Sequence, residues 1–310
     1  MTELAPVLPR YPVYIPSKGR AAPDAALTAR FLLHDGVPFR LVVEPQEAAQ
    51  YTEHFGQEHV LILPFSNLGQ GSIPARNWIK DHATTEGHAR HWQLDDNIRL
   101  IRRMWRGKRI PCNAGVALRA CEDWTDRYEN IAIAGLNYTM FAYTGGVRVK
   151  HGGMPPFYLN AHVYSCTLVL NSLPHRWRGR YNEDTDICLQ VLGDGWCTVL
   201  INAFLAEKVQ TMVMKGGNTS ALYQGDGRLK MARALERKWP GVVETRRKWQ
   251  RPQHVIKDNW RRFDTPLKRR VDAAVPAVPN EYGMRLRQVA PEIKSERLRA
   301  LLAAQEQGQA

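Results

Sequence analysis

Hydrophobic residues fall in short runs along the first 210 residues, and the runs alternate between two periods. Compact stretches of Val, Ile and Leu are typical of buried strands, whereas apolar residues three and four positions apart are typical of helices. This alternation predicts an α/β domain. The predicted strands are Tyr11–Ile15, Phe39–Val43, Val60–Leu63, His91–Leu94, Ile131–Ala134, parts of Tyr158–Leu170, and Cys197–Phe204. The predicted helices are Pro23–His34, Glu47–Phe55, one that begins near Pro74, Ala114–Tyr128, Asp184–Leu192 and Thr219–Trp239.

Composition changes along the chain and indicates three parts. We predict an α/β domain over residues 8–215, a basic helical region over residues 216–270 and a loosely packed tail over residues 271–310. The tail has one more predicted helix, at Ser295–Gln305. The glycines and prolines of Gly145–Pro156 predict a mobile loop within the first part.

Overall composition excludes several classes of protein. With 44% hydrophobic and 24% charged residues among 310, the chain is neither wholly disordered nor collagen-like. No apolar run approaches the roughly 18–20 residues that cross a bilayer, and Met1–Leu4 lacks the basic start of a signal peptide. The five cysteines form no CxxC pair, which argues against a disulfide framework or a zinc knuckle. We therefore expect a cytoplasmic protein without a membrane segment.

Positive charge is concentrated in one region. The chain has 43 Lys and Arg against 30 Asp and Glu, a net charge of +13, and residues 226–270 contribute fifteen of the basic and only five of the acidic residues. Trp239, Trp249, Trp260 and Phe263 lie among these cations. Cations with interleaved rings suit a nucleic acid, because cations neutralise phosphates and rings stack on unpaired bases. The alternative is a solvated helix face whose tryptophans pack inward, and charge alone does not choose between DNA, RNA and solubility.

The clearest local signal for chemistry is Asp95-Asp96-Asn97, which directly follows the predicted strand His91–Leu94. Open α/β sheets bind ligands at the carboxyl edge of their strands. Two carboxylates there suit Mg²⁺ or Mn²⁺, which commonly bridge to phosphates. A solvated acidic turn is the alternative, but the position after three strand–helix units favours the metal site.

Three other segments have residues suited to a nucleotide or to proton transfer. Pro16-Ser17-Lys18-Gly19-Arg20 joins the first strand to the first helix and offers backbone N–H groups and cations. Ile73-Pro74-Ala75-Arg76-Asn77 opens a helix, where free N–H groups favour an anion. The acids of Tyr181–Asp186 suit a general base, although acids at a helix start also stabilise the helix itself. Each segment taken alone is equally compatible with an ordinary turn or cap.

Other motifs carry less information. His88 and His91 have no third metal ligand in a recognisable pattern, and Lys215-Gly216-Gly217-Asn218 is either a diphosphate cradle or a flexible loop. The sequence has no GxSxG, no GxxxxGK[ST] and no GxGxxG after the first strand. Hydrolase, P-loop and dinucleotide-binding functions therefore lose support.

Taken in order, these segments resemble a glycosyltransferase of the GT-A fold, a Rossmann-type mixed sheet flanked by helices, over about residues 10–215. Within that fold the chain looks most like the phage TET-associated glycosyltransferases. The resemblance rests on Val13–Arg20, Ile73–Asn77, Gln93–Asn97 and Tyr181–Asp186. It implies transfer of a sugar from a UDP-sugar to 5-hydroxymethylpyrimidines, chiefly 5-hydroxymethylcytosine, in phage DNA, and hence a protein of the host cytoplasm.

The resemblance also assigns roles to individual residues. It places the donor nucleotide at Pro16, Ser17, Lys18, Arg20, Glu44, Arg76, Asn77, Asp95 and Asp96. Asp96 and Asn97 would hold Mn²⁺ or Mg²⁺, although Asn97 stands where a third acid is common. Asp184 would be the general base, with Glu183 as the alternative and Asp186 behind it. In the basic region, DNA would meet Arg246, Arg247, Lys248, Arg251, Arg261 and Arg262.

The implied reaction is metal-dependent and inverting, with the acceptor nucleotide turned out of the duplex and a tryptophan of the basic region stacking or filling the gap. A retaining route remains open if Asp184 lies far from the acceptor. Three alternatives stay open: the same fold with a saccharide, lipid or protein acceptor, a nucleic-acid-binding protein without catalysis, and a nucleotidyltransferase. The sequence does not choose the sugar, the pyrimidine or the oligomeric state.

Overall fold

The computed structural model describes residues 6–22, 24–144, 154–209, 226–248, 250–280 and 283–285. Residues 1–273 form one compact unit, and residues 274–310 form a second. The described part of the second unit contains no helix or strand. None of the described helices is long and apolar enough to cross a membrane. Lys215–Asn218, most of the predicted loop Gly145–Pro156 and the predicted helix Ser295–Gln305 lie outside the described residues.

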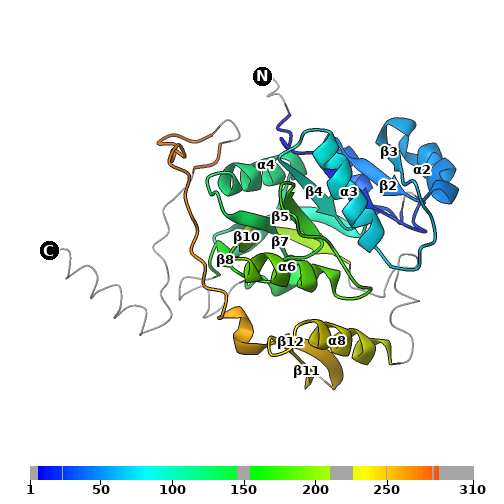
Figure 1. The fold of residues 1–310 in the computed structure, drawn as a ribbon. Coiled ribbons are helices and arrows are strands. Elements are labelled where there is room, and N and C mark those ends of the chain that lie inside the picture. Colours follow the sequence, from blue (N-terminus) through cyan, green and yellow to red (C-terminus); the bar gives the residue numbers. More distant parts are fainter. Residues whose placement is uncertain are drawn as a thin grey trace. The chain divides into compact units, whose positions relative to one another are not determined.

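A ten-stranded mixed sheet forms the centre of the first unit (Figure 1). Its order is β3-β2-β1-β4-β9-β7-β10-β5-β6, and β8 also pairs with β10. Strands β1 to β4 are parallel to one another and β10 is parallel to β7, whereas β9, β5, β6 and β8 run antiparallel to their neighbours. The strands are β1 (Val13–Pro16), β2 (Arg40–Val43), β3 (Val60–Ile62), β4 (Arg90–Leu94), β5 (Ile98–Trp105), β6 (Lys108–Cys112), β7 (Ile131–Tyr138), β8 (Phe157–Leu159), β9 (Cys166–Leu170) and β10 (Cys197–Lys208).

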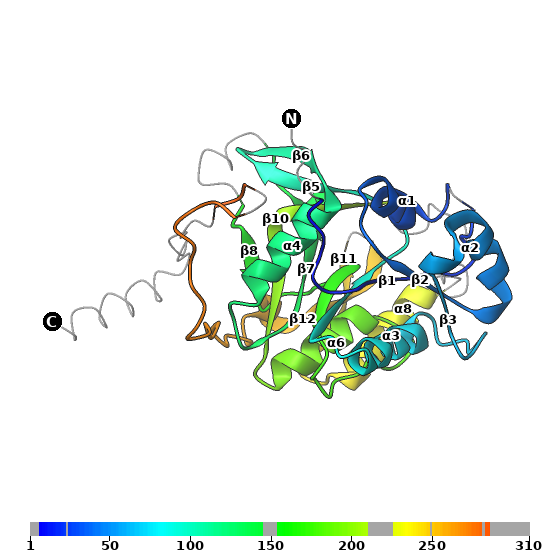
Figure 2. The same ribbon diagram turned by 90° about the horizontal axis from the view of Figure 1, so that it is seen from above.

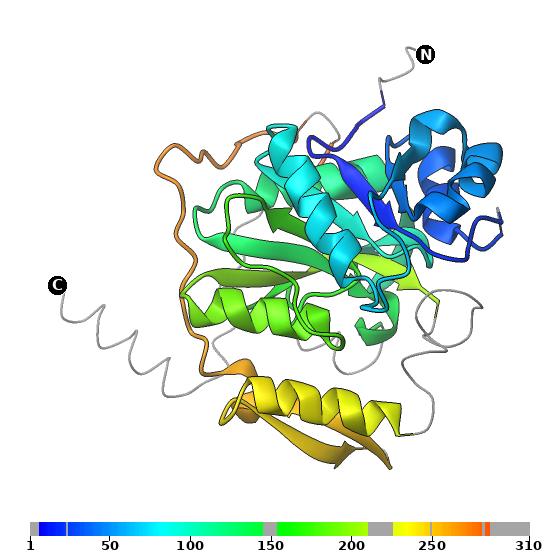
Figure 3. The same cartoon turned by 45° about the vertical axis from the view of Figure 1, so that its right-hand side comes forward.

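Helices lie on both faces of this sheet. Figures 1 and 3 show α3 and α6 along one face, and Figure 2 shows α1 on the other side of β1. This follows from right-handed crossovers, because the chain moves outward from β1 to β3 and then returns through α3 to β4. Helix α4 lies on the face opposite α3, because the neighbouring residues Trp92 and Gln93 of β4 bond to α4 and to α3 respectively. The helices are α1 (Leu27–His34), α2 (Ala48–Phe55), α3 (Ile73–Thr85), α4 (Ala114–Thr125) and α6 (Glu183–Gly193), with short 3₁₀ turns η1 (Pro45–Glu47), η2 (Gln57–His59), η3 (Thr139–Phe141) and η4 (Lys257–Trp260).

Strand β4 is central, and all five of its residues are buried. Its polar side chains are therefore paired inside the protein. Trp92 donates its indole N–H to Glu122 over 2.8 Å, and Gln93 donates to the backbone oxygen of Arg76 over 3.1 Å. Since buried polar groups are stable only when hydrogen-bonded, these contacts fix the strand that carries Asp95-Asp96-Asn97 at its end.

The predicted strands and helices of the first 210 residues are all present, with ends shifted by a few residues. The prediction missed the hairpin of β5 and β6. Arginines interrupt its apolar pattern, and its turn, Arg106-Gly107, is an unusual pair for a tight hairpin. Both residues have positive φ angles, 47° and 73°, as a two-residue hairpin turn of type I′ requires.

The region predicted as basic and helical contains a hairpin as well as a helix. Helix α8 (Gly227–Lys238) is followed by strands β11 (Val243–Lys248) and β12 (Arg251–Ile256), which pair with each other. Leu235, Val243 and Ile256 form a buried cluster with Leu189 of α6, and Figure 3 shows α8 and the hairpin beside α6. The region therefore belongs to the same compact unit as the sheet. Residues 219–225 of the predicted helix Thr219–Trp239 lie outside the described part of the chain.

Candidate active site

The motifs named above meet at the carboxyl edge of the sheet. Ser17 follows β1, Asp95 follows β4, and Lys208 ends β10. Because β9 runs antiparallel to β4, its amino end lies at the same edge, and the backbone N–H of Asp95 donates to the oxygen of Ser165 over 2.7 Å. Segments that are far apart in the sequence thus place polar side chains on one rim.

Asp96 is the centre of a buried cluster at the end of β1. Its Oδ2 accepts from the Ser17 hydroxyl over 2.7 Å, and its Oδ1 forms an ion pair with Arg20. The hydroxyl of Tyr51 completes the cluster, lying 2.7 Å from Ser17 Oγ and accepting from the Arg20 backbone N–H over 3.1 Å. Burial raises the pKa of the Asp96 carboxyl, and the charge of Arg20 opposes that rise. Asp96 therefore fastens the turn Ser17–Arg20 to the sheet.

Asp95 lies between two cations. Its Oδ1 accepts from Arg76 Nη2 over 2.8 Å, and its Oδ2 accepts from Lys208 Nζ over 2.6 Å and from the Ser165 hydroxyl over 2.7 Å. Burial alone would raise the pKa of Asp95, but the positive charges of Lys208 and Arg76 outweigh it and hold the pKa well below its usual range. Asp95 is thus an ionised group whose two oxygens are both engaged.

Arg76 joins this rim to the acids of α6. Its Nε lies 3.8 Å from Glu183 Oε1, which also accepts from the Ser72 hydroxyl over 3.0 Å. Burial and the adjacent charge of Asp184 raise the pKa of Glu183, and Arg76 opposes them. Glu183 therefore points toward α3 and helps to hold Arg76.

Asp184 faces a different set of partners. Its Oδ1 accepts from the Thr185 backbone N–H over 2.7 Å, and its Oδ2 lies 3.2 Å from His162 Nε2. Burial would raise the pKa of Asp184, but the electrostatic interaction and hydrogen bond with His162 and the hydrogen bond from the Thr185 N–H hold it below the usual range. The side chain is still 38% exposed. Asp184 is therefore an ionised carboxylate that solvent can reach and that can accept a proton, but its lowered pKa makes it a weaker base than an ordinary carboxylate.

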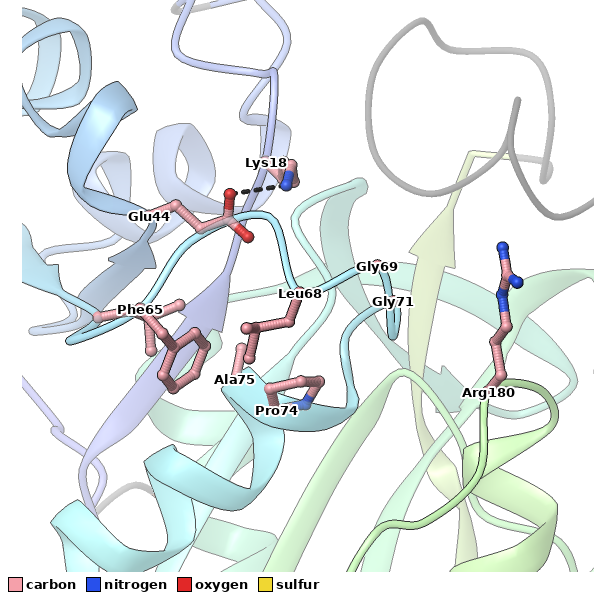
Figure 4. A pocket seen from close by; sticks show the side chains of 10 residues that line it. Lys18, Glu44, Phe65, Leu68, Gly69, Gly71, Pro74, Ala75 and Arg180 are labelled. Carbon is pink, nitrogen blue, oxygen red and sulfur yellow. Dashed lines mark hydrogen bonds and ion pairs between the residues drawn. The ribbon is translucent and has the colours of Figure 1, made fainter.

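A pocket lies beside the Ser17–Arg20 turn (Figure 4). Lys18 and Glu44 form its charged side and are joined by an ion pair of 2.6 Å. Phe65 and Leu68 contribute apolar walls, and Figure 4 shows Arg180 across the opening from them. Further lining residues are Leu63, Gly69, Gly71, Pro74 and Ala75. An apolar wall with a few charged groups is typical of a small-molecule site.

Two residues that the resemblance implicated are engaged elsewhere. The Asn77 side chain donates to the backbone oxygen of Trp177 over 2.7 Å and accepts from its N–H over 3.0 Å. Asp186 is fully buried and holds Arg178, Gln190 and the indole N–H of Trp239 at 2.9, 2.8 and 2.7 Å. Asn77 therefore fixes a loop and Asp186 fixes α6 to α8, and neither points to a ligand role.

The predicted metal ligands do not fit a divalent ion as they are arranged. Both oxygens of Asp96 are engaged by Arg20 and Ser17, and both oxygens of Asp95 are engaged by Arg76, Lys208 and Ser165. Asn97 Oδ1 is buried and has no hydrogen-bond partner among the described residues, but it is a single neutral ligand. Within those residues no three His, Cys, Asp or Glu side chains gather as a metal site. The arrangement of the described residues therefore does not support the divalent ion that the sequence predicts.

Comparison with protein families identifies the family of this chain. A family model of the TET-associated glycosyltransferases matches residues 11–217, about two thirds of the chain. The chain belongs to the TET-associated glycosyltransferase family. Family membership and the mixed sheet flanked by helices confirm the predicted glycosyltransferase and its GT-A-like fold class.

Other comparisons add little to this family assignment. No curated protein matches the chain. A crystal structure assigned as a nucleotide-diphospho-sugar transferase from Desulfovibrio desulfuricans G20 is similar with a TM-score of 0.33 and 11% identity, over 59% of this chain and 77% of that one.

For this TET-associated glycosyltransferase, sequence motifs missed four residues of the rim. Lys208 and Ser165 contact Asp95 from positions 113 and 70 residues away. His162 contacts Asp184, and His254 Nε2 of β12 lies 3.3 Å from the Thr185 hydroxyl. None of the four belongs to a local pattern. Lys208 ends β10, Ser165 and His162 precede β9, and His254 lies on β12, so only the tertiary structure brings them together.

The predicted DNA-contacting residues of this glycosyltransferase lie on the hairpin and just after η4. Arg246, Arg247, Lys248, Arg251, Arg261 and Arg262 are all exposed. Arg246 pairs with Glu244 at 2.6 Å, and Arg262 lies 3.7 Å from Asp258. Trp239, Trp260 and Phe263 instead pack against the cluster around Leu189 and Leu235, so these three rings pack inward as the alternative interpretation expects. Trp249 lies outside the described residues.

Proposed function

We propose that the protein transfers a sugar from a UDP-sugar to the hydroxymethyl group of a 5-hydroxymethylpyrimidine in DNA, with 5-hydroxymethylcytosine as the principal acceptor. The observation that carries the proposal is the ionic chain Lys208–Asp95–Arg76–Glu183, which joins the ends of β10 and β4 to the start of α6. It brings three of the motifs on which the resemblance rests to one rim. The family assignment supports the acceptor class.

The donor occupies the side of the rim near β1. Its nucleobase enters the pocket between Phe65 and the Lys18–Glu44 pair (Figure 4). Its diphosphate lies toward Arg76 and Lys208, the two cations of the ionic chain. These cations stabilise the additional negative charge that develops on the leaving nucleoside diphosphate, and stabilisation of developing charge is a large contribution to catalysis.

Asp184 acts as the base in the transfer step. Its carboxylate takes the proton of the hydroxymethyl group while the hydroxyl oxygen forms a bond to the anomeric carbon. The bond from that carbon to the phosphate oxygen breaks at the same time, and its electron pair leaves with the nucleoside diphosphate. Attack from the face opposite the leaving group inverts the anomeric configuration. Asp184 suits this role better than Glu183, because it is ionised and exposed whereas Glu183 is bonded to Ser72.

The acceptor polymer lies along the basic hairpin. Arg246, Arg247, Lys248 and Arg251 contact its phosphates, with Arg261 and Arg262 beside them. Strand β12 also carries His254, which reaches Thr185 next to Asp184. A polymer held on the hairpin is therefore near the base.

The deciding experiment incubates the enzyme with three duplexes of one sequence, which contain cytosine, 5-hydroxymethylcytosine or 5-hydroxymethyluracil, and a panel of UDP-sugars. Mass spectrometry of the released nucleosides identifies the product. We expect a hexose adduct on a hydroxymethylated nucleoside and none on cytosine. Donor hydrolysis without any adduct, or transfer to an added saccharide instead, would refute the proposed acceptor.

A further inference from the structure

A row of aromatic side chains connects the two halves of the site. We call it the aromatic strip, and it consists of Tyr138, Phe141, Tyr164, His162 and Trp260. The ring centroids of Tyr138 and Tyr164 are 4.4 Å apart, those of Tyr164 and His162 are 5.0 Å apart, and those of His162 and Trp260 are 6.0 Å apart. Phe141 contacts both tyrosines, at 5.8 and 6.4 Å. The rings come from three segments of the chain, so the strip is a product of the fold.

The aromatic strip extends from Lys208, the cation proposed to lie near the leaving phosphate, to Asp184, the proposed base. At one end, Lys208 Nζ lies 5.6 Å from the centroid of the Tyr138 ring, and Tyr138 bonds to Ser165 beside Asp95. At the other end, His162 Nε2 lies 3.2 Å from Asp184 Oδ2. A group that is held against the strip is therefore between the cation near the leaving phosphate and the base.

The strip is rigid where it meets the protein and open where it meets solvent. The hydroxyl of Tyr164 donates to Asn137 over 2.6 Å, and that of Tyr138 bonds to Ser165, so both rings have fixed orientations. Trp260 has a φ of 70°, a strained backbone for a bulky residue that persists only where the surroundings hold it. Phe141, in contrast, is 52% exposed. An exposed ring that rests on anchored rings contributes little to the core, but it offers a flat surface on which another ring can stack.

We propose that the aromatic strip is the surface on which the pyrimidine of the acceptor stacks after it leaves the duplex, with Phe141 as the exposed ring that it covers. The proposal rests on the proposed function, because it assumes a DNA acceptor. A base must leave the helix before its 5-substituent reaches a buried sugar, and enzymes that act on bases hold the extruded ring between apolar or aromatic groups. Every base has a flat face, so such a surface binds the pyrimidine without reading the sequence around it.

The test compares Phe141→Ala with Met140→Ala. Met140 is the adjacent residue of the same 3₁₀ turn and is 49% exposed, but it has no ring. We expect Phe141→Ala to raise the KM for hydroxymethylated duplex by about tenfold, the order that loss of one base–ring contact gives. The free nucleotide 5-hydroxymethyl-dCMP should lose inhibitory potency by a similar factor. Met140→Ala should change neither value by more than about twofold, and Phe141→Trp should restore both.

Donor hydrolysis in the absence of DNA distinguishes this proposal from the proposed function. It should be the same in the wild type, Phe141→Ala and Met140→Ala, because the strip is assigned to the acceptor. If the wild type hydrolyses the donor but modifies no hydroxymethylated DNA, the proposed acceptor is wrong. If the wild type modifies DNA and Phe141→Ala behaves like Met140→Ala toward both DNA and nucleotide, only the stacking surface is wrong.

Discussion

Lys208 Nζ lies 2.6 Å from Asp95 Oδ2, so an acid of the predicted metal motif is already neutralised by a side chain of the protein. The Lys208 side chain is only 13% exposed. Burial would lower the pKa of Lys208, but the charge of Asp95 outweighs it and raises the pKa. The ammonium group is thus a fixed positive charge at the rim.

From this pair we predict that donor binding does not depend on a divalent ion. The Kd of a UDP-sugar, measured by isothermal titration calorimetry, should change by less than about twofold in EDTA. Lys208→Met should raise that Kd about ten- to hundredfold, because a charge-assisted hydrogen bond contributes about 1.5–3 kcal/mol. Mn²⁺ should partly restore binding to Lys208→Met, since the substitution frees Asp95 Oδ2 as a ligand. Loss of wild-type binding in EDTA and its recovery with Mn²⁺ would show that a metal displaces Lys208.

Two neighbouring acids of α6 test the assignment of the base, with Asp184 as the proposed base and Glu183 as the matched control. Asp184→Asn should lower kcat by about 10²- to 10⁴-fold, the usual contribution of general base catalysis, with the donor Kd unchanged. Glu183→Gln changes the same functional group one residue away and should lower kcat by less than about tenfold, because Glu183 acts only through Ser72 and Arg76. Steady-state kinetics with hydroxymethylated duplex measure both. Equal losses in the two variants would remove the distinction between base and supporting residue.

Charge reversal on two different hairpins distinguishes direct DNA contact by the β11–β12 hairpin from attraction by the net charge of the protein. Arg247→Glu/Lys248→Glu on β11 and Arg106→Glu/Lys108→Glu at the β5–β6 turn change the net charge equally, and all four residues are exposed. We expect only the first pair to raise the KM for DNA and to reduce its salt dependence by about two phosphate contacts. Assays at several salt concentrations measure this. Equal effects of the two pairs would mean that net charge rather than the β11–β12 hairpin attracts the polymer.

Residues of this site could be predicted from the sequence where a nearby pattern marks them, and could not be predicted where their role depends on a contact with a residue far away along the chain. Asp95 and Asp184 lie at ends of elements whose apolar periodicity is visible locally, so a pattern of strands, helices and acids locates them. Lys208 and His162 contact these acids across long stretches of sequence and stand in no motif. The pairing of β10 with β7 and β5 places Lys208 at the rim, and strand pairing is not visible in one sequence. The type I′ turn at Arg106-Gly107 was missed for a local reason, since arginine rarely adopts a positive φ.

The buried histidine of β4 predicts how stability depends on pH. His91 is completely buried and bonds to Asn171, and burial lowers its pKa from 6.5 to about 4. The unfolded chain binds a proton at His91 near pH 6.5, whereas the folded chain does so only near pH 4. The contribution of the neutral His91 to the free energy of unfolding is therefore complete above pH 6.5 and is lost progressively as the pH falls toward 4. A difference of this size corresponds to about 3 kcal/mol of the free energy of unfolding.

Urea denaturation of the wild type and of two variants between pH 7 and pH 4 tests this. His91→Gln removes the titrating group and should flatten the decline over this range, even if the variant is less stable at pH 7. His34→Gln is the matched control, because the side chain of His34 is 87% exposed and its loss should leave the slope of the wild type unchanged. A decline in His91→Gln as steep as in the wild type would place the pH sensitivity on a second histidine such as His254, whose pKa burial also lowers. Asp95 does not compete with this explanation, because its low pKa makes its ion pairs fail only in stronger acid.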